Sequence, residues 1–265
     1  MITNVIKYAI ATIIICLLSS SMAASQSLTK VKISTVIKSN DRVNTNNITT
    51  NEGRPGWFIE LSRRSAQECN AELQFEFIPW VRALLLLKQA KLDAVFNSSY
   101  MEERENYGVY PQVDGILDEQ RASMKYSYYA YVLRNSNDEE LREQAALSNR
   151  NIVVERAASI IPELEKRGAK IKEHVNYSSM LKMVAHHRAD AAIGIDKSFD
   201  TLLDNTPALA TIIMKVKTPV RLKFGYVMFS KLFYADHPEL VECFWDKSAK
   251  NRKTGWFKKL YQSYQ

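Results

Sequence analysis

Apolar and polar positions alternate in two different ways along the first hundred residues. Residues 31–37 (VKISTVI) alternate with a period of two, which predicts a half-buried strand. The helical spacing of apolar residues predicts a helix over 57–68, and a second strand is predicted over 73–78. After Pro79 another amphipathic helix leads to a third strand over 92–96. The order strand, helix, strand, helix, strand is typical of one half of a doubly wound α/β fold.

The second and third of these strands give the position of a candidate site. A strand, a crossover helix and a strand of this size form a βαβ unit, so strands 73–78 and 92–96 are expected to be parallel. Open α/β sheets bind ligands beside the carboxyl ends of their strands. The polar residues that follow the third strand are therefore candidate ligand-binding residues: Asn97, Ser98, Ser99 and Tyr100.

The α/β alternation returns after Pro111. Residues 112–125 are polar and indicate no clear element, and a strongly β-prone segment (YSYYAYVL) begins at Tyr126. From there the pattern predicts strands over 126–133, 151–155, 170–174, 191–195 and 221–229, and helices over 138–147, 159–167, 178–187, 238–250 and 254–264.

The first 25 residues are typical of a secretory signal peptide. Lys7 is the only charged residue among them, residues 10–18 are apolar, and small residues flank Met22. The apolar segment is shorter than the roughly 20 residues that span a bilayer. We expect cleavage after Ala23 or Ser25, with an uncleaved N-terminal anchor as the alternative. The mature protein is then expected in the periplasm.

The composition suits a globular exported protein of one large domain or two lobes. Hydrophobic residues make up 46% of the chain and aromatic residues 10%, and the formal charge is +7. Loss of Lys7 leaves +6, which favours an anionic ligand, an acidic membrane or nucleic acid. The basic residues are scattered rather than in one block, and export argues against nucleic acid.

Two of the three cysteines, Cys69 and Cys243, lie outside the signal peptide. An oxidising compartment permits a disulfide between them. Their spacing does not show that they meet, and a pair of buried free thiols is the alternative.

Four short motifs, spread over nearly all of the mature chain, resemble those of one protein family. Residues 91–95 (KLDAV) resemble its Gly-Lys-x-Asp-Ala strand entry, and residues 101–104 (MEER) resemble a loop that ends in Glu-Arg. Residues 188–193 (RADAAI), followed by Asp196, resemble the equivalent strand of a second lobe. Residues 253–257 (KTGWF) resemble its closing helix. The chain thus resembles the type II periplasmic solute-binding proteins of the amino-acid-binding (family 3) group, which serve ABC transporters.

The resemblance implies an α/β fold of two lobes. Each lobe would be a doubly wound sheet with flanking helices, and two crossing strands would join them. Behind a signal peptide over 1–25, the first lobe would comprise residues 26–126 and 224–265, and the second lobe residues 127–223.

The resemblance also implies two charged ligand contacts. Arg104 would bind a ligand carboxylate, because a guanidinium binds carboxylates in a fork; a surface arginine paired with Glu102 or Glu103 is the alternative. Asp196 would accept the ligand ammonium, or else cap the helix that follows it.

Further candidates come from their position at strand and helix ends. Trp57, Trp80 and Tyr100 are aromatic residues that can stack on a ligand. Arg82 offers a second cation, or is a solvated arginine near the start of its helix. Ser159 offers a hydroxyl near a helix N-terminus, or is an ordinary N-cap.

The chain departs from the family pattern at several positions. Ala90 and His187 replace glycines, and residues 155–159 (ERAAS) stand where the second lobe has a Gly-Ser/Thr turn. These changes bear on which ligand is bound rather than on the fold.

The sequence therefore predicts a solute-binding protein that captures a small carboxylate-bearing, amino-acid-like ligand for an ABC permease. We expect it to act as a monomer, without a cofactor or a metal. No nucleophile motif is present, and His186 and His187 are adjacent on a helix and diverge. Two alternatives remain: an enzyme of the cyclohexadienyl dehydratase type, for which Glu155 is the candidate acid or base, and a sensor or docking module for a membrane partner.

Overall fold

The computed structural model describes residues 28–35 and 56–264. The predicted signal peptide (1–25) lies outside these residues, as does the polar segment 38–51, which we interpret as a loop between the first predicted strand and the first helix. Within them, no helix combines the length and the apolar character that crossing a bilayer requires.

The first lobe contains the predicted β-α-β-α-β half. Strand β1 (Thr29–Thr35) pairs in parallel with both β2 (Ala71–Phe77) and β3 (Ala94–Ser99). Helices α2 (Trp57–Gln67) and α3 (Trp80–Lys88) connect these strands. The prediction that β2 and β3 are parallel is confirmed, with β1 between them.

The second lobe repeats this arrangement. Strand β8 (Asn151–Glu155) pairs in parallel with β9 (Lys170–His174) and β10 (Ala191–Ile195). Helices α5 (Ile161–Lys166) and α6 (Tyr177–Ala185) connect them. Asn176 caps α6 by accepting the N–H of Ser179, so the helix begins one residue before the predicted start at residue 178.

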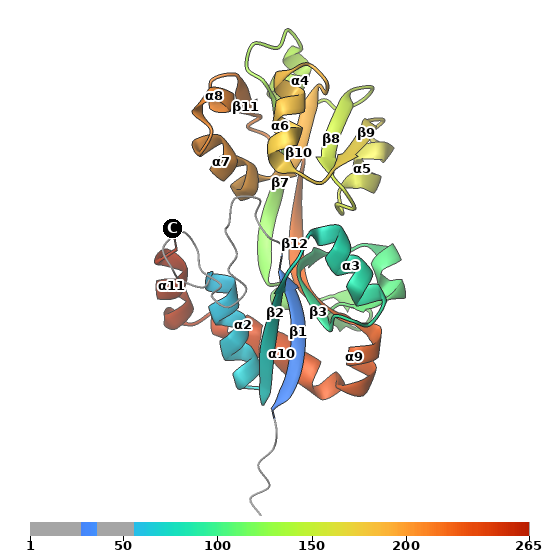
Figure 1. Cartoon of the computed structure of the whole chain (residues 1–265), viewed down its shortest axis with the longest axis vertical. Coiled ribbons are helices and arrows are strands. Elements are labelled where there is room, and N and C mark those ends of the chain that lie inside the picture. Colours follow the sequence, from blue (N-terminus) through green and yellow to red (C-terminus); the bar gives the residue numbers. More distant parts are fainter. Residues whose placement is uncertain (1–27, 36–55, 265) are drawn as a thin grey trace, which may run out of the picture.

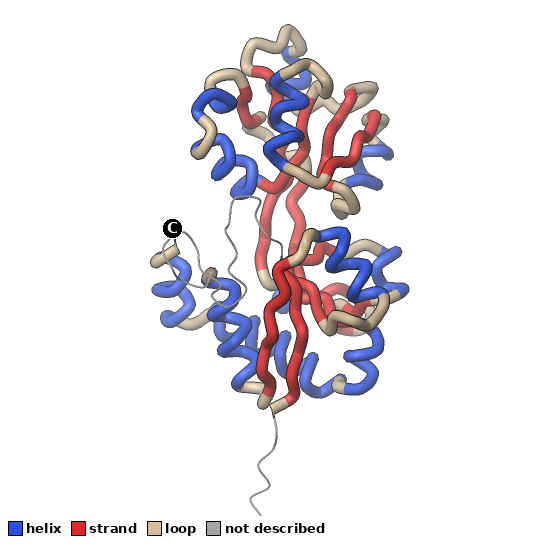
Figure 2. The backbone as a smooth tube through the Cα atoms, in the orientation of Figure 1, coloured by secondary structure: helices blue, strands red, loops and turns tan. Residues whose placement is uncertain are grey.

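Two long strands join the lobes and make one continuous sheet. Strand β7 (Met124–Leu133) pairs antiparallel with β12 (Arg221–Ser230) through its first half and with β10 through its second. The strand order is β2-β1-β3-β12-β7-β10-β8-β9. Figures 1 and 2 show only these two strands running between the lobes among the described residues. The two-lobed α/β fold is thus confirmed, while the exact boundaries, which fall within β7 and β12, stay predictions.

The remaining elements are shorter or lie at the end of the chain, and most of the short ones were not predicted, because segments of two to six residues carry little periodic signal. They are η1 (Glu102–Asn106), β4 (Gly108–Val109), β5 (Gln112–Val113), β6 (Ile116–Leu117), η2 (Glu119–Arg121), α4 (Glu139–Gln144), α7 (Asp196–Asp204), α8 (Pro207–Ala210), β11 (Ile213–Lys215), α9 (Lys231–Asp236), α10 (Pro238–Arg252) and α11 (Gly255–Gln262).

Each lobe has its own apolar core on both faces of the sheet. In the first lobe one core contains Ile33, Phe58 and Trp245, and the core beneath α3 contains Leu87 and Met228. In the second lobe the cores lie beneath α4 and α5 and beneath α6 and α7. Separate cores allow the lobes to behave as units that meet only along the hinge strands and the cleft.

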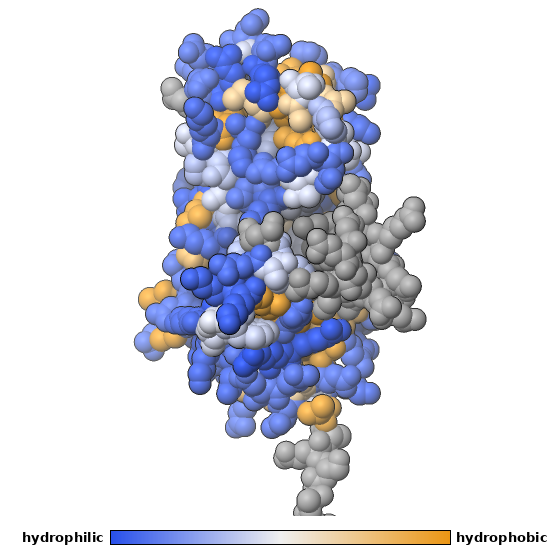
Figure 3. Space-filling model, turned by 90° about the vertical axis from the view of Figure 1, so that its left-hand side faces the viewer, coloured by the Kyte–Doolittle hydropathy of each residue, from blue (hydrophilic) through white to orange (hydrophobic). Residues whose placement is uncertain are grey.

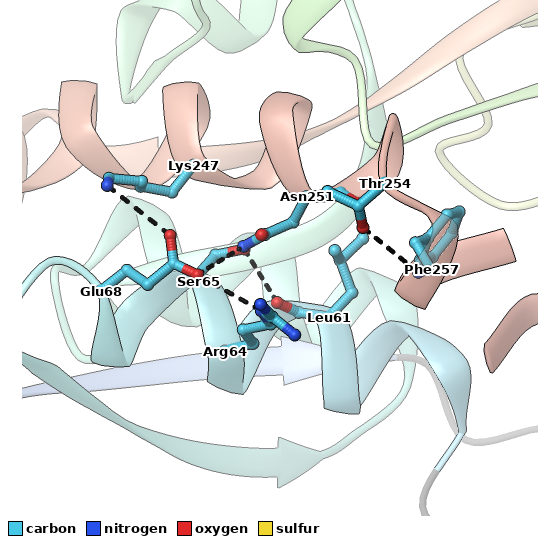
Figure 4. A network of polar contacts seen from close by, with 8 residues as sticks. All are labelled: Leu61, Arg64, Ser65, Glu68, Lys247, Asn251, Thr254 and Phe257. Atoms are coloured by element: carbon cyan, nitrogen blue, oxygen red, sulfur yellow. Dashed lines mark hydrogen bonds and ion pairs between the residues drawn. The ribbon is translucent and has the colours of Figure 1, made fainter. Parts of the chain in front are cut away.

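Helix α10 is fixed to α2 by a disulfide and a polar network. Cys69 and Cys243 are bonded to each other, with their Cα atoms 5.9 Å apart, so the two cysteines do meet. Next to this bridge the carboxylate of Glu68 accepts from Asn251 at 3.3 Å and lies 3.6 Å from Lys247 (Figure 4). Asn251 also donates to Ser65. The end of the chain is thereby held against the start of the first lobe.

The face turned to the viewer in Figure 3 is mostly hydrophilic, and its apolar residues lie in small separate groups. Such scattered apolar residues are ordinary on a soluble surface and do not by themselves mark an interface.

Candidate functional site

Arg104 lies buried where the two lobes meet. It belongs to the short helix η1 that follows β3, and only 3% of it is exposed. Its Nη1 donates to the carbonyl oxygen of Ser99 at 2.7 Å, and its Nη2 donates to the carbonyl oxygen of Ala157 at 2.8 Å. Ala157 belongs to the second lobe, so one guanidinium bridges the cleft. Its Nη1 also donates to the hydroxyl of Ser98 at 3.3 Å. A buried guanidinium needs its donors satisfied, and here all three of these partners are uncharged.

Trp80 completes this bridge from the first turn of α3. Its indole Nε1 donates to the same Ala157 oxygen at 3.3 Å, and the guanidinium of Arg104 lies over its ring at 5.1 Å from the centroid. The indole thus offers Arg104 a cation–π contact while pointing its N–H at the other lobe. Ala157 itself has φ +58° and donates its N–H to Glu173.

Asn97 marks an irregularity in the strand that leads to Arg104. The pairing of β3 with β12 shifts register between Tyr226 and Met228, and Asn97 has φ +59°. This bulge turns its side chain onto Gly225: a Cβ built on that glycine would lie 1.9 Å from Asn97 Oδ1. The buried Oδ1 has no hydrogen-bond partner among the described residues.

Ser98 and Ser99 lie inside β3 rather than in a loop after it. Both are buried. The hydroxyl of Ser98 is 2.9 Å from that of Tyr110, and the hydroxyl of Ser99 makes a short hydrogen bond with that of Tyr126 on β7. Burial raises the pKa of Tyr110 to about 12, so this hydroxyl stays neutral.

One face of the two strands that join the lobes, β7 and β12, lies toward this site. Tyr126 pairs with Lys223, and alternate residues of a strand share a face, so Tyr128 lies on the same side. Lys223 donates to the carbonyl oxygen of Ser159 at 2.9 Å, and burial lowers the pKa of its ammonium. The hydroxyl of Ser159 is buried beside that of Tyr128 but without the geometry of a hydrogen bond. Ser159 is not the N-cap of α5, because that position is Ile160.

Glu155 contributes a buried carboxyl to the same junction. It is the last residue of β8, and its Oε2 accepts the hydroxyl of Tyr177 at 2.7 Å. Burial raises the pKa of this carboxyl, an effect that the hydrogen bond from Tyr177 and the charge of Arg104 partly offset. The site therefore combines a guanidinium of the first lobe with a carboxyl of the second.

Asp196 follows β10, whose carboxyl end lies at the same edge of the sheet as that of its parallel neighbour β8. It is the first residue of α7, its Oδ1 accepts the N–H of Lys197 at 2.8 Å, and its carbonyl accepts from Tyr131. Helix α7 flanks the sheet on the side opposite to α3 and α5 (Figure 1). The helix-capping alternative is not observed, because Ile195 is the N-cap of α7 and no side chain caps that helix. The ligand role of Asp196 stays a prediction.

Three other predicted residues make contacts of a different kind. Trp57 packs edge-on against the rings of Phe96, Phe257 and Tyr261 within the first lobe. Arg82 is exposed on α3. Tyr100 donates to Glu105 at 3.2 Å and lies edge-on to Tyr110, which places it at the margin of the Arg104 site.

Sequence reasoning missed the tyrosines that line the site. Tyr126 and Tyr128 were visible as alternate residues of a predicted strand, which is the signal that would have placed them on one face. Tyr177 and Lys223 carry no such signal, because only the folded lobes bring them to the cleft. No group of three or more potential metal ligands is gathered in the part of the chain that the structure describes.

Neither a protein-family model nor a curated protein sequence matches the chain. Solved structures do. A histidine kinase sensor domain with similarity to periplasmic binding proteins is 16% identical, with a TM-score of 0.69 over 89% of this chain and 96% of that chain. The substrate-binding protein of an amino acid ABC transporter is 12% identical, with a TM-score of 0.64 over 88% and 98%.

A third similar structure is that of a precursor of an enzyme. It is an ancestral amino-acid-binding protein, a precursor of cyclohexadienyl dehydratase, and is 16% identical with a TM-score of 0.61 over 88% of this chain and 94% of that chain. At such identities the likeness is one of fold. The chain therefore has the two-lobed type II fold of the periplasmic amino-acid-binding proteins.

Proposed function

We propose that this protein is an extracytoplasmic solute-binding protein that captures a small carboxylate-bearing, amino-acid-like ligand between its lobes. The ligand would be passed to an ABC permease. The solute-binding fold supports the first part, and the resemblance of the sequence motifs supports the importer.

The observation that carries the proposal is the position of Arg104. Its guanidinium is almost fully buried, yet among the described residues it contacts no carboxylate: its closest partners are the backbone oxygens of Ser99 and Ala157. A ligand carboxylate that replaced the Ala157 oxygen would form a charge-assisted hydrogen bond, which is roughly twice as strong as a neutral one. Closure of the second lobe over the ligand would then restore the contacts across the cleft.

The test is binding by the mature protein, residues 26–265, against amino acids, dicarboxylates, polyamines and small peptides. A ligand present at about a hundred times its dissociation constant adds roughly 2.7 kcal/mol to the stability of the folded state, a visible thermal shift. Arg104→Ala is expected to weaken a carboxylate ligand by about 2–5 kcal/mol. Arg82→Ala is the matched control, because Arg82 is exposed on α3. Equal affinity for wild type and Arg104→Ala would refute the role of Arg104.

The same proposal sets the compartment and the partners. The predicted signal peptide would direct the protein to the periplasm, where an oxidising environment suits the bond between Cys69 and Cys243. A monomer meeting an inner-membrane permease is the expected form, and sedimentation of the mature protein checks it.

The similarity to a sensor domain favours one second candidate, a module that reports its ligand to a membrane partner. Ligand binding is common to both roles. A permease captured by cross-linking supports import, and capture of a signalling protein instead supports the sensor.

A further inference from the structure

The loop that follows β8 is contacted by two cations and not by one. Arg104 donates to the carbonyl oxygen of Ala157 at 2.8 Å, and Lys223, on β12, donates to that of Ser159 at 2.9 Å. Two residues of main chain span at most about 7 Å, so the guanidinium and the ammonium approach the same short segment of the second lobe.

Lys223 has no counter-ion in the described part of the chain. The carboxylate that acts on it is that of Glu163, but one oxygen of Glu163 lies 2.6 Å from Arg167 and the other 3.3 Å from Arg221. Burial lowers the pKa of Lys223, and the charges of Arg221 and Arg104 lower it further against the effect of Glu163. A charge that is taken out of water without a partner costs free energy. An anion is therefore the group that this half-buried ammonium lacks.

A hydroxyl without a partner lies at the same place. Ser159 is only 6% exposed, and its buried Oγ has no hydrogen-bond partner among the described residues. Tyr128 lies beside it on the strand face that Lys223 shares, because Lys223 pairs with Tyr126. Burial raises the pKa of Tyr128, so its hydroxyl stays a neutral donor. An ammonium and hydroxyl donors together suit an acidic group.

Resting on the proposed function, we infer that Lys223 and Ser159 bind a second acidic group of the ligand, which is a dicarboxylate whose first carboxylate is bound by Arg104. The second carboxylate replaces the Ser159 carbonyl oxygen at Lys223, as the first replaces the Ala157 oxygen at Arg104. Each exchange gives a buried cation a charged acceptor in place of a neutral one. The second cation that the sequence suggested at Arg82 is exposed on α3, and Lys223 supplies it from β12 instead.

The experiment uses pairs of probes that differ only in a carboxylate and the amide that replaces it: L-glutamate and L-glutamine, L-aspartate and L-asparagine, succinate and succinamate. Calorimetry on the mature protein measures the preference for the acid within each pair. We expect the wild type to prefer at least one acid by about tenfold or more. Lys223→Met removes the ammonium but keeps a long side chain, and it is expected to abolish that preference while still binding the amide.

Lys125→Met is the matched control. Lys125 is exposed, lies over the ring of Phe224 and precedes Tyr126 on β7, so its side chain leaves the strand on the face opposite to that of Tyr126 and Lys223. It is expected to retain the preference for the acid.

The outcomes separate the two proposals. If the wild type binds each amide as tightly as its acid, if Lys223→Met keeps the preference, or if Lys125→Met loses it, the second subsite is overturned, while Arg104-dependent binding still supports the receptor. If none of these probes binds but another carboxylate does so through Arg104, the dicarboxylate assignment fails and the proposed function stands. If no carboxylate binds, both fail.

Two further variants keep the test decisive if Lys223→Met does not fold. Lys223→Arg keeps a cation at this position and is expected to retain the preference. Ser159→Ala removes only the unpartnered hydroxyl and is expected to reduce the preference by roughly two- to twelvefold. An unchanged preference in Ser159→Ala would overturn the role of Ser159.

Discussion

The carbonyl oxygen of Ala157 accepts hydrogen bonds from Arg104 at 2.8 Å and from Trp80 at 3.3 Å. Both donors belong to the first lobe, and the acceptor belongs to the second. This backbone oxygen is therefore one point at which the two halves of the candidate site contact each other, and Ala157 also packs against the first-lobe core beneath α3.

Replacing Trp80 by Phe tests this contact. The phenyl ring retains an aromatic face for Arg104 but removes the indole N–H that reaches Ala157. Loss of one neutral hydrogen bond costs about 0.5–1.5 kcal/mol, so we expect a bound ligand to weaken by roughly two- to twelvefold. Titration calorimetry measures the change. Trp256→Phe is the control, because Trp256 packs over Arg64 at the end of the chain; an equal loss in both variants would contradict the prediction.

Gly225→Ala tests the packing of Asn97. The new Cβ would lie 1.9 Å from Asn97 Oδ1 and 3.1 Å from Tyr126 Cε1, so the Asn97 side chain must move. Overpacking of this kind typically costs about 1–3 kcal/mol, and we expect that loss in the free energy of unfolding from denaturant titration.

Two further variants decide the cause of that loss. Gly255→Ala is the control, since a Cβ there meets no atom within 4 Å. Asn97→Gly removes the clashing side chain and suits the positive φ at that position, so the double variant Asn97→Gly/Gly225→Ala should recover part of the stability. Additive losses in the double variant would show that Asn97 is not the obstacle.

The disulfide predicts a large effect of reduction. The bridge between Cys69 and Cys243 spans 174 residues, and removing a native disulfide typically costs about 2–5 kcal/mol. We expect dithiothreitol to lower the unfolding midpoint of the mature protein. The Cys69→Ser/Cys243→Ser variant should have the lower midpoint with or without dithiothreitol. If the midpoint of the wild type does not change on adding the reductant, the disulfide is absent in solution.

The ionisation of Glu155 predicts the direction in which the stability of the folded protein changes with pH. Its pKa in the folded protein lies above the usual value of 4.5, chiefly because the carboxyl is buried. The folded state therefore holds the proton more tightly, and this contribution to stability is complete below pH 4.5 and is lost as the pH rises through the raised pKa. Glu155→Gln cannot ionise, so without ligand it should become more stable relative to wild type between pH 4 and pH 7. Thermal melts at both values check this, and a difference that does not change with pH would contradict it.

The strands and long helices were predictable because their apolar residues repeat regularly. Strands β8 and β10 were predicted with their observed ends, and the βαβ unit from β2 to β3 follows from the same pattern. The position of Arg104 was also predictable, from a motif that places it just after a strand. These features depend on residues that are neighbours in sequence.

The rest of the site depends on contacts between distant segments. The turn of Asn97 onto Gly225 needs the bulge between β3 and β12, which no local pattern indicates. The backbone at Ala157, whose oxygen accepts from Arg104, has a positive φ, a conformation that the presence of an alanine does not predict. The ammonium contact at Asp196, implied by resemblance, stays a prediction, and no sequence pattern indicated that the carboxyl of Glu155 would be buried near Arg104.

The covalent bridge within the first lobe has a topological consequence for the second. Cys69 precedes β7 and Cys243 follows β12 in the sequence. The disulfide therefore closes a covalent loop of main chain that contains the whole second lobe. A protease that cuts one exposed turn of that lobe would leave both fragments tethered to the same molecule. On a denaturing gel the nicked protein would run as a single band until the disulfide was reduced. The two new chain ends would also stay in one molecule, so their reassociation would not depend on protein concentration.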